Sequence, residues 1–290
     1  MGRPSFGAVL VTGASRGIGR ATAVLLGRMG LTVYGTVRSD GDAAQLSEAT
    51  NGGVVPLRCD VADAVSVKAM AQELWRRTGE TGLAGLVNNA GIAVAGPLEA
   101  LPTEAWREQF EVNVLGVVRV TRALLPLLRL GSGRIVNISS ASGLIAIPYL
   151  GPYGASKAAL DRVSEILRLE LRPWGIPVCV IQPGLVDTGA PGRFLSMAEE
   201  LLGEADGVVW QLYAPYIARM HALARGRVEG GMPPERVAQV IARALLARRP
   251  RRVYRIGMEA HALAAVAQWM PGWLREWLVS RALVGSRDGG

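Results

Sequence analysis

Lysine is almost absent from this sequence. The 32 basic residues include only two lysines, Lys68 and Lys157, so arginine carries nearly all of the positive charge. Lys157 follows Tyr153 by four residues, a spacing that places both side chains on one face of a helix. An ammonium is a compact point charge, unlike the planar fork of arginine, and beside a phenol it favours the phenolate. We therefore expect a pocket in which Lys157 lowers the pKa of Tyr153, although a surface helix with one tyrosine and one lysine fits this short motif too.

Cysteine and histidine are equally scarce, with two copies of each. Cys59 and Cys179 both lie in apolar, strand-like runs, as expected of buried, reduced thiols in a cytosolic protein. No C-x-x-C pair occurs, and His221 and His261 lack the spacing of metal ligands. The sequence therefore predicts a cytoplasmic protein without a metal site.

Long hydrophobic runs are also missing. The apolar stretch Ala8–Val11 is too short for the core of a signal peptide, and no uncharged stretch is long enough to span a bilayer. The formal charge is +8, but the arginines are spread along the chain, and their one tight run, 248–252, fits a solvated turn before a strand. We therefore expect no nucleic-acid partner, since anionic cofactor phosphates or a membrane surface account more simply for the charge.

What the sequence does contain is a regular alternation of short apolar runs and helical patterns. The strand-like runs are Ala8–Val11, Thr32–Val37, Val54–Cys59, Gly85–Val87, Arg134–Ile138, Val178–Ile181 and Arg252–Ile256. The helix-like segments include Gly17–Met29, Ala64–Thr78, Thr103–Leu128, Tyr153–Arg172 and Pro234–Arg248. Such alternation predicts an α/β fold, a doubly wound parallel seven-stranded sheet (Rossmann fold) with helices on both faces. In this fold the ligand crevice lies at the carboxyl ends of the strands.

Two segments depart from the alternation within what we expect to be one domain over residues 1–290. Residues 187–232 form a long excursion that contains aromatic residues, methionines and leucines, which predicts a substrate-binding lid. Residues 258–284 form a C-terminal helical extension in which Trp269, Trp273 and Trp277 are spaced by fours. These tryptophans fit a membrane-surface face, or packing against the core or another subunit, and packing is the simpler interpretation.

A glycine-rich turn follows the first predicted strand. Residues 12–19 read Thr-Gly-Ala-Ser-Arg-Gly-Ile-Gly, a G-x-x-x-G-x-G spacing between a strand and a helix. Glycines at such a turn let the backbone approach a pyrophosphate, whose charge lies against the helix N-terminus. A turn that serves only packing is the alternative, but the flanking strand and helix favour a dinucleotide-binding turn.

Five motifs follow one another along the chain: Thr12–Gly19, Asn88-Asn-Ala-Gly91, Ser139-Ser140, Tyr153-x-x-x-Lys157 and Pro183-Gly184. In this order they resemble the short-chain dehydrogenase/reductase family over residues 7–190, and the resemblance is weak beyond that point. It implies a nicotinamide dinucleotide held by strand-end residues: Gly13, Ser15, Arg16, Gly17, Ile18, Gly19, Arg38, Asp60, Val61, Asn88, Ala90, Gly91, Tyr153, Lys157, Pro183, Gly184, Val186 and Thr188. By the same resemblance, Asp60 and Val61 flank the adenine, Asn88 approaches the adenosine ribose, and Thr188 helps to fix the carboxamide.

The resemblance also implies a catalytic set of four residues, Asn113, Ser140, Tyr153 and Lys157. Family members place the catalytic serine thirteen residues before the tyrosine, which selects Ser140 over Ser139. Tyr153 is then the general acid in carbonyl reduction and the general base in alcohol oxidation. Ser140 stabilises charge on the substrate oxygen, Lys157 bonds the nicotinamide ribose, and Asn113 supports a water relay to the lysine. By themselves, Ser140 fits a turn residue and Asn113 a polar link between a helix and a loop.

Arginines near the expected phosphate position favour NADP(H) over NAD(H). Arg38 follows the second predicted strand, where an acidic residue would instead bond a ribose 2′-hydroxyl, and Arg16 lies inside the glycine turn. Asp40 is close by and argues in the other direction.

The segments Thr36–Arg38 and 96–99, with the long lid, resemble the hydroxysteroid and retinol dehydrogenase branch. They imply a bulky apolar alcohol or ketone as substrate, such as a steroid, a retinoid or a lipid-derived carbonyl, and an apolar lid is consistent with such a substrate. A 3-oxoacyl-thioester reductase and a non-catalytic NADP(H)-sensing protein are the alternatives. We further expect a homodimer or homotetramer, with peripheral membrane contact through the tryptophans as an open alternative.

Overall fold

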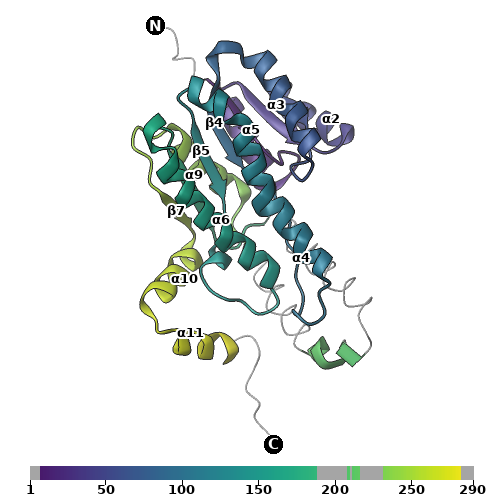
Figure 1. Ribbon diagram of the computed structural model, residues 1–290, viewed down its shortest axis with the longest axis vertical. Coiled ribbons are helices and arrows are strands. Elements are labelled where there is room, and N and C mark those ends of the chain that lie inside the picture. The colour runs from purple at the N-terminus through teal and green to yellow at the C-terminus, as the bar shows by residue number, and fades with distance from the viewer. Residues whose placement is uncertain (1–6, 188–207, 210, 216–230, 282–290) are drawn as a thin grey trace, which may run out of the picture.

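The computed structural model describes residues 7–187, 208–209, 211–215 and 231–281, and its central feature is one parallel sheet (Figure 1). The strands are β1 Ala8–Val11, β2 Val33–Val37, β3 Val54–Arg58, β4 Leu83–Asn88, β5 Arg134–Ile138, β6 Val178–Pro183 and β7 Val253–Ile256. Their order across the sheet is β3-β2-β1-β4-β5-β6-β7, and every neighbouring pair is parallel. The prediction of a seven-stranded doubly wound sheet is therefore confirmed.

Helices connect the strands and cover both faces of the sheet. They are α1 Gly17–Arg28, α2 Asp40–Ala49, α3 Ala64–Thr78, α4 Thr103–Phe110, α5 Gly116–Leu130, α6 Gly151–Glu170, α9 Pro234–Leu246, α10 Met258–Trp269 and α11 Gly272–Val279. Short turns of helix lie between them: η1 Gly79–Thr81, the π-helical η2 Glu111–Leu115, η3 Ala141–Gly143 and η4 Arg172–Trp174. Within the described part of the chain, no helix is both long and apolar enough to cross a membrane.

Two differences from the sequence prediction have local causes. The helix expected over 103–128 is divided into α4 and α5, because η2 widens the backbone to a π turn around Asn113. Helix α2 was not predicted, since Leu46 is its one buried residue and it therefore has almost no apolar stripe. It begins at a Ser39 cap, whose hydroxyl accepts a hydrogen bond from the Asp42 backbone at 3.1 Å.

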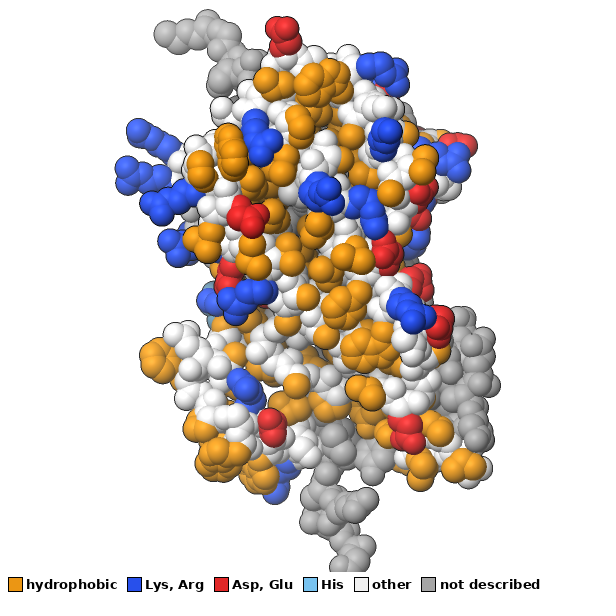
Figure 2. All heavy atoms as spheres, viewed as in Figure 1, with side chains coloured by type: hydrophobic (Ala, Val, Ile, Leu, Met, Phe, Trp, Pro, Cys, Tyr) orange, Lys and Arg blue, Asp and Glu red, His pale blue; other side chains and the backbone are white. Residues whose placement is uncertain are grey.

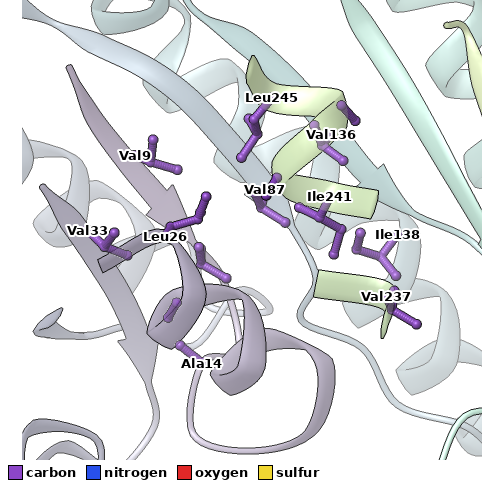
Figure 3. Packing of buried hydrophobic residues seen from close by; sticks show 14 of the residues in the cluster. Val9, Ala14, Leu26, Val33, Val87, Val136, Ile138, Val237, Ile241 and Leu245 are labelled. Atoms are coloured by element: carbon purple, nitrogen blue, oxygen red, sulfur yellow. The ribbon is translucent and has the colours of Figure 1, made fainter. Parts of the chain in front are cut away.

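Each face of the sheet has its own hydrophobic cluster. On one face, α9 turns Val237, Ile241 and Leu245 toward side chains of the central strands such as Val87 and Val136 (Figure 3). On the other face, buried leucines of α3 and α5 pack on β1, β4 and β5. The two cysteines are buried free thiols, as predicted, and burial raises the pKa of each. Burial of both faces explains why the strands are almost continuously apolar.

The order of the strands determines where a ligand can bind. Successive strands run outward from β1 to β3 on one side and from β4 to β7 on the other. The loops that leave β1 and β4 therefore diverge, and they open a crevice at the carboxyl edge of the sheet.

Candidate active site

A cavity of about 890 Å³ occupies this edge of the sheet. Loops after six of the strands contribute to its wall, and α10 and α11 close part of it. Most of the residues predicted from the sequence line it: Gly13, Ser15, Arg16, Gly17, Ile18, Arg38, Asp60, Val61, Ala90, Gly91, Ser140, Tyr153, Lys157, Pro183, Gly184 and Val186. Gly19, Asn88 and Asn113 are not part of the lining, and Thr188 lies outside the described residues.

The glycine turn between β1 and α1 has a geometry that suits a phosphate. Gly13 and Gly17 have φ angles of +65° and +54°, which residues other than glycine rarely adopt. A Cβ on Gly13 would lie 2.9 Å from the Cα of Ala90, so the backbone of the next loop comes too close for any side chain. No side chain caps the first turn of α1, which leaves its backbone N–H groups available to an anion beside Arg16 and Gly17. These residues fit the pyrophosphate of a dinucleotide.

Asn89 fastens the glycine turn to β4. Its Nδ2 donates to the backbone oxygens of Thr12 at 2.9 Å and Gly13 at 3.1 Å. The Thr12 hydroxyl in turn accepts from the backbone nitrogens of Asn89 and Ala90 at 2.9 and 3.0 Å. Sequence reasoning missed Asn89, although it stands beside Asn88 in the same motif. Asn89 lines the cavity and is the asparagine that supports the glycine turn.

Asn88 does not occupy the position predicted for it. As the last residue of β4 it is 2% exposed, and its Nδ2 donates to Thr121 Oγ1 at 3.1 Å and Asn137 Oδ1 at 2.9 Å. Successive residues of a strand point to opposite faces, so when Asn88 faces α5 its neighbour turns toward the cavity. The expected contact of Asn88 with the adenosine ribose is not supported by this buried position, since Asn88 does not line the cavity. Its role is to join β4, β5 and α5.

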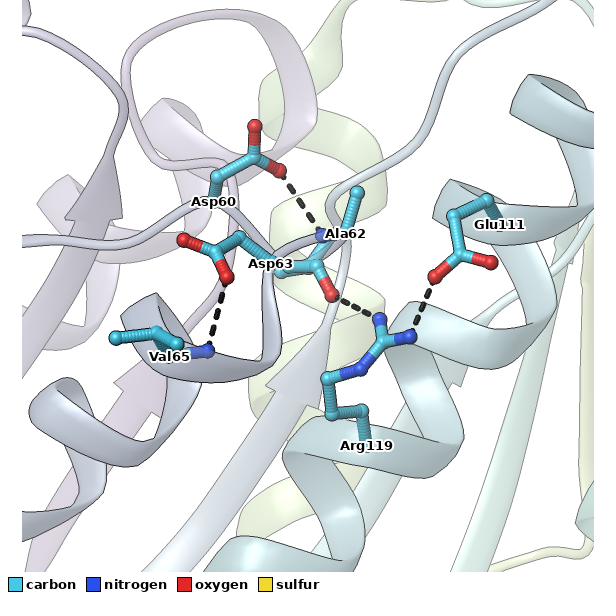
Figure 4. Close-up of polar contacts among 7 residues, drawn as sticks. Asp60, Ala62, Asp63, Val65, Glu111 and Arg119 are labelled. Carbon is cyan, nitrogen blue, oxygen red and sulfur yellow. Dashed lines mark hydrogen bonds and ion pairs between the residues drawn. The ribbon is translucent and has the colours of Figure 1, made fainter.

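The loop after β3 forms the far end of the cavity and is held by backbone contacts (Figure 4). Asp60 Oδ1 accepts from the Ala62 backbone nitrogen at 2.9 Å, and Asp63 caps α3 by accepting from Val65 at the same distance. Arg119 of α5 donates to the backbone oxygen of Val61 at 2.6 Å and is ion-paired with Glu111. The cavity wall formed by Asp60 and Val61 is therefore positioned without any contact from a ligand.

The charged groups near β2 divide into two sets. Arg16 and Arg38 are exposed side chains on the cavity wall. Asp40, which argued against a phosphate in this region, lies outside the lining and pairs with Arg58 at 3.5 Å on the surface. Among the described residues, neither Arg16 nor Arg38 forms an ion pair with a carboxylate.

Ser140 and Tyr153 lie at the opposite end of the cavity from Asp60. Ser140 caps η3, and its oxygen accepts from the Ser142 backbone nitrogen at 3.2 Å and the Ser142 hydroxyl at 2.9 Å. With both acceptor positions used, the Ser140 hydroxyl proton remains available as a donor to the cavity. Tyr153 keeps some accessible surface because it faces the open cavity, but protein atoms enclose it densely enough that burial raises its pKa, which the Ser140 hydroxyl partly offsets.

Lys157 is one turn after Tyr153 on α6 and is 6% exposed. Its Nζ donates to the backbone oxygen of Ile138 at 2.9 Å and lies 5.7 Å from the centre of the Tyr153 ring. Burial lowers the Lys157 pKa to about 8, and the carboxylate of Asp161 opposes this change. The expected lowering of the Tyr153 pKa is not found, because burial of the phenol raises this pKa.

Asn113 connects two elements beside the lysine. Its Oδ1 accepts from the Ile92 backbone nitrogen at 2.9 Å, and its Nδ2 donates to the Ile92 oxygen at 3.0 Å and to Ser156 Oγ at 3.1 Å. The π turn of η2 aims the buried amide at both partners. Asn113 therefore fastens the loop after β4 to α6, and its part in a water relay stays a prediction.

Of the segment predicted to be a lid, the described residues do not line the cavity, whereas the C-terminal helices do. In the described part of the predicted lid, the Tyr213 hydroxyl donates to Glu99 at 2.8 Å, and its ring lies edge-on to Tyr149. Sequence reasoning missed the contribution of the C-terminal helices, which place these side chains on the cavity wall: Glu259, Ala262, Leu263 and Val266 from α10, and Arg275, Leu278 and Val279 from α11.

Comparison with known proteins agrees with this arrangement. Residues 7–197 match the family model described as short chain dehydrogenase. A 3-ketodihydrosphingosine reductase from Bacteroides thetaiotaomicron is 34% identical, over 91% of this chain and 93% of its own. An 11-beta-hydroxysteroid dehydrogenase type 2 from Homo sapiens is 35% identical, over 92% of this chain and 68% of its own. An NADPH-dependent 3-dehydrocapnine reductase from Ornithobacterium rhinotracheale is 33% identical, over 84% of this chain and 86% of its own.

Solved structures give the same result. A short-chain dehydrogenase from Streptomyces avermitilis superposes with a TM-score of 0.78 at 29% identity, covering 98% of both chains. One from Burkholderia cenocepacia in complex with NADP has a TM-score of 0.72 at 25% identity, over 96% of this chain and 98% of its own. Another from Burkholderia phymatum, in complex with NAD, has a TM-score of 0.75 at 28% identity, over 92% of this chain and 94% of its own.

Proposed function

Because this chain belongs to the short-chain dehydrogenase family, we propose that it is an NADP(H)-dependent oxidoreductase that interconverts a bulky apolar alcohol with its ketone or aldehyde. The observation that carries the proposal is the placement of Ser140, Tyr153 and Lys157 in the same cavity as the glycine turn. A dinucleotide that starts at the turn reaches the tyrosine through one continuous space.

The residues of the cavity have distinct roles in this reaction. The nicotinamide, when bound, supplies or accepts the hydride. Tyr153 donates its phenolic proton to the carbonyl oxygen during reduction and takes the proton back during oxidation. Ser140 donates a hydrogen bond to the same oxygen and stabilises the charge that develops on it. The ammonium of Lys157 keeps positive charge near that oxygen and offers donors to ribose hydroxyls.

The apolar substrate class is supported by the cavity wall around the catalytic residues. Aliphatic side chains from the η3–α6 loop and from the C-terminal helices surround this end: Ile145, Ile147, Leu150, Leu263, Val266 and Leu278. Two relatives are named for a ketodihydrosphingosine and a hydroxysteroid, which are both large and mostly apolar. A steroid or a long-chain ketone would bury most of its surface against such a wall.

The function is tested by following nicotinamide absorbance with a panel of apolar ketones and alcohols, with both NADPH and NADH. We expect turnover of steroid-like or long-chain ketones, faster with NADPH than with NADH. Turnover restricted to acyl thioesters would instead identify a 3-oxoacyl-thioester reductase. Tight NADPH binding without turnover across the panel would identify a cofactor-sensing protein.

The preference for NADP(H) is supported by Arg16 and Arg38, two exposed guanidiniums on the cavity wall whose charge suits a 2′-phosphate. Replacement of Arg38 with alanine should weaken NADPH binding about tenfold, since a charge-assisted hydrogen bond contributes about 1.5–3 kcal/mol. The affinity for NADH should change much less. Arg28→Ala is the matched control, because Arg28 is exposed at the end of α1 and outside the cavity. An equal loss of affinity for both cofactors would contradict the assignment.

We also propose that the protein is cytoplasmic and contacts membranes peripherally through the outer face of α10 and α11. Apolar side chains gather on this part of the molecule (Figure 2), including the exposed Trp269, Trp273 and Trp277. Tryptophan favours the interface between headgroups and acyl chains, and Arg281, whose guanidinium lies 5.5 Å from the centre of the Trp277 ring, can pair with lipid phosphate. Other residues of the same helices line the cavity, so an apolar substrate dissolved in the membrane would have a short path to Tyr153.

The membrane proposal is tested by cosedimentation with phosphatidylcholine vesicles, with and without phosphatidylglycerol. We expect the wild-type protein to sediment and the triple variant Trp269→Ser, Trp273→Ser, Trp277→Ser to remain in solution. Trp75→Ser is the control, because Trp75 on α3 is 50% exposed, close to the 53% of Trp277. Absence of sedimentation, together with a smaller oligomer in the triple variant by light scattering, would make the face a subunit interface. We also propose that the protein is a homodimer or homotetramer, and the same light-scattering measurement gives its oligomeric state.

A further inference from the structure

We propose that Asp161 is a positioning residue. Gln182 holds the Asp161 carboxylate, and this carboxylate keeps the buried Lys157 protonated in the cavity. Its consequence for turnover rests on the proposed function, whereas its effect on the lysine does not.

Three residues from two elements make up this arrangement. Asp161 lies one turn after Lys157 on α6, on the same face of the helix. Its Oδ2 accepts a hydrogen bond from Gln182 Nε2 at 2.8 Å, and Gln182 is on β6, 4% exposed. The carboxylate is therefore anchored to the sheet and does not depend on the helix alone for its position.

The second oxygen of Asp161 gives the reason to assign it an electrostatic role. Oδ1 is buried and has no hydrogen-bond partner within the described part of the chain. A buried carboxylate oxygen without a donor is costly, and a nearby cation lowers that cost. The Lys157 ammonium is the cation that acts on Asp161. Of the three N–H donors of this ammonium, only one is used by the backbone oxygen of Ile138.

The groups around Lys157 leave Asp161 as the source of the compensating charge. On α6, Tyr153 is a neutral phenol and Asp161 is the neighbouring acid, with the exposed Glu165 one turn further. The neighbouring β5, η2 and β6 contribute the neutral Ser139, Asn113 and Gln182. Across the cavity, the carboxylate of Glu259 on α10 accepts from the Leu185 backbone nitrogen at 3.3 Å. Burial alone drives the lysine toward the neutral amine, and Asp161 is the group that opposes it.

The hydroxyl of Ser139 adds to the same network. It donates to the backbone oxygen of Lys157 at 3.3 Å, and it lies near enough to Asp161 to lower the pKa of that carboxyl. Burial is the largest cause and raises the Asp161 pKa overall, while Ser139, Gln182 and Lys157 offset part of this rise. The acid and the lysine therefore stabilise each other's charged form.

The scarcity of lysine makes a direct test possible. Selective labelling of lysine with ¹³C at Cε gives only two side-chain signals, from Lys157 and from the exposed Lys68 on α3, which serves as an internal reference. The labelled protein is titrated without cofactor. In the wild-type protein we expect Lys157 to titrate near its pKa of about 8. In Asp161→Asn, which can still accept the Gln182 hydrogen bond, we expect the midpoint to fall by about one pH unit or more.

Two further variants separate charge from structure. Asp161→Glu should restore most of the wild-type midpoint, because it restores the carboxylate. Glu165→Gln should leave the midpoint unchanged, since Glu165 is on the surface and pairs with Arg162. An Asp161→Asn protein that is folded by circular dichroism and has the wild-type Lys157 midpoint overturns the proposal.

The effect on catalysis is measured as the pH profile of kcat/KM for reduction. The alkaline limb should move to lower pH in Asp161→Asn and should return with Asp161→Glu. A lowered Lys157 midpoint with an unchanged pH profile overturns the positioning role. If the wild-type protein turns over no substrate, the proposed function fails, and the labelled titration still tests whether Asp161 keeps Lys157 charged.

Discussion

Replacement of Tyr153 with phenylalanine is expected to lower the turnover number by about a thousandfold or more, because general acid–base catalysis contributes roughly 10²–10⁴. The change removes one oxygen atom and leaves the ring that faces the cavity. The glycine turn, Asn89 and Lys157 keep their own contacts in the variant. We therefore expect the affinity for NADPH to stay close to that of the wild-type protein, so that the loss is confined to the proton transfer.

Two measurements separate these effects. Titration of NADPH fluorescence gives the dissociation constant, and single-turnover reduction of an apolar ketone gives the rate of the chemical step. Tyr254→Phe is the matched control, because Tyr254 is on β7, away from the cavity, and its hydroxyl accepts from the backbone nitrogen of Arg251. A Tyr153→Phe protein that reduces the ketone at the wild-type rate would show that another group supplies the proton.

Burial affects the protonation state of Tyr153. Burial disfavours the phenolate, so Tyr153 keeps its proton over the neutral range and can donate it to a carbonyl oxygen. Alcohol oxidation requires the opposite protonation state. Tyr153 therefore enters carbonyl reduction in the protonated form that the proposed proton donation requires.

The motifs could be located from the sequence because each depends on local chemistry. The turn at residues 12–19 needs glycine where φ is positive, and Tyr153 and Lys157 share a helix, so their spacing alone places them on one face. The sheet was predictable for a similar reason, since burial on both faces makes each strand a continuous apolar run.

The errors concern properties that depend on contacts between distant parts of the chain. Asn88 and Asn89 are adjacent and chemically identical. Which of the two side chains reaches the cavity depends only on which face of the sheet each one points to, and Asn89 is the one that does. The net change in the Tyr153 pKa could not be predicted from the spacing of Tyr153 and Lys157, because it depends on burial by elements that are distant in the sequence. The contribution of α10 and α11 to the cavity wall likewise depends on where the chain returns after β7.

The second large effect is expected at Gly19, where even a methyl group cannot be accommodated. A Cβ on this residue would lie 2.2 Å from the backbone oxygen of Gly13 and 2.4 Å from Asn89 Nδ2. The hydrogen bond between this oxygen and this amide holds the glycine turn against Asn89. Gly19→Ala must therefore push α1 away from the turn and break the link between Gly13 and Asn89, although Gly19 itself does not line the cavity.

Overpacking of this kind typically costs about 1–3 kcal/mol, so we expect urea unfolding to report a loss of that size in the free energy of unfolding. NADPH affinity should fall by more than tenfold, because the backbone groups that face the pyrophosphate are displaced with the turn. Gly27→Ala on the same helix is the control, since its Cβ would meet the Gly53 oxygen at a milder 3.2 Å while gaining up to about 1 kcal/mol of helix propensity. If the two alanine variants bound NADPH equally well, the close approach of α1 to the turn would not be what forms the cofactor site.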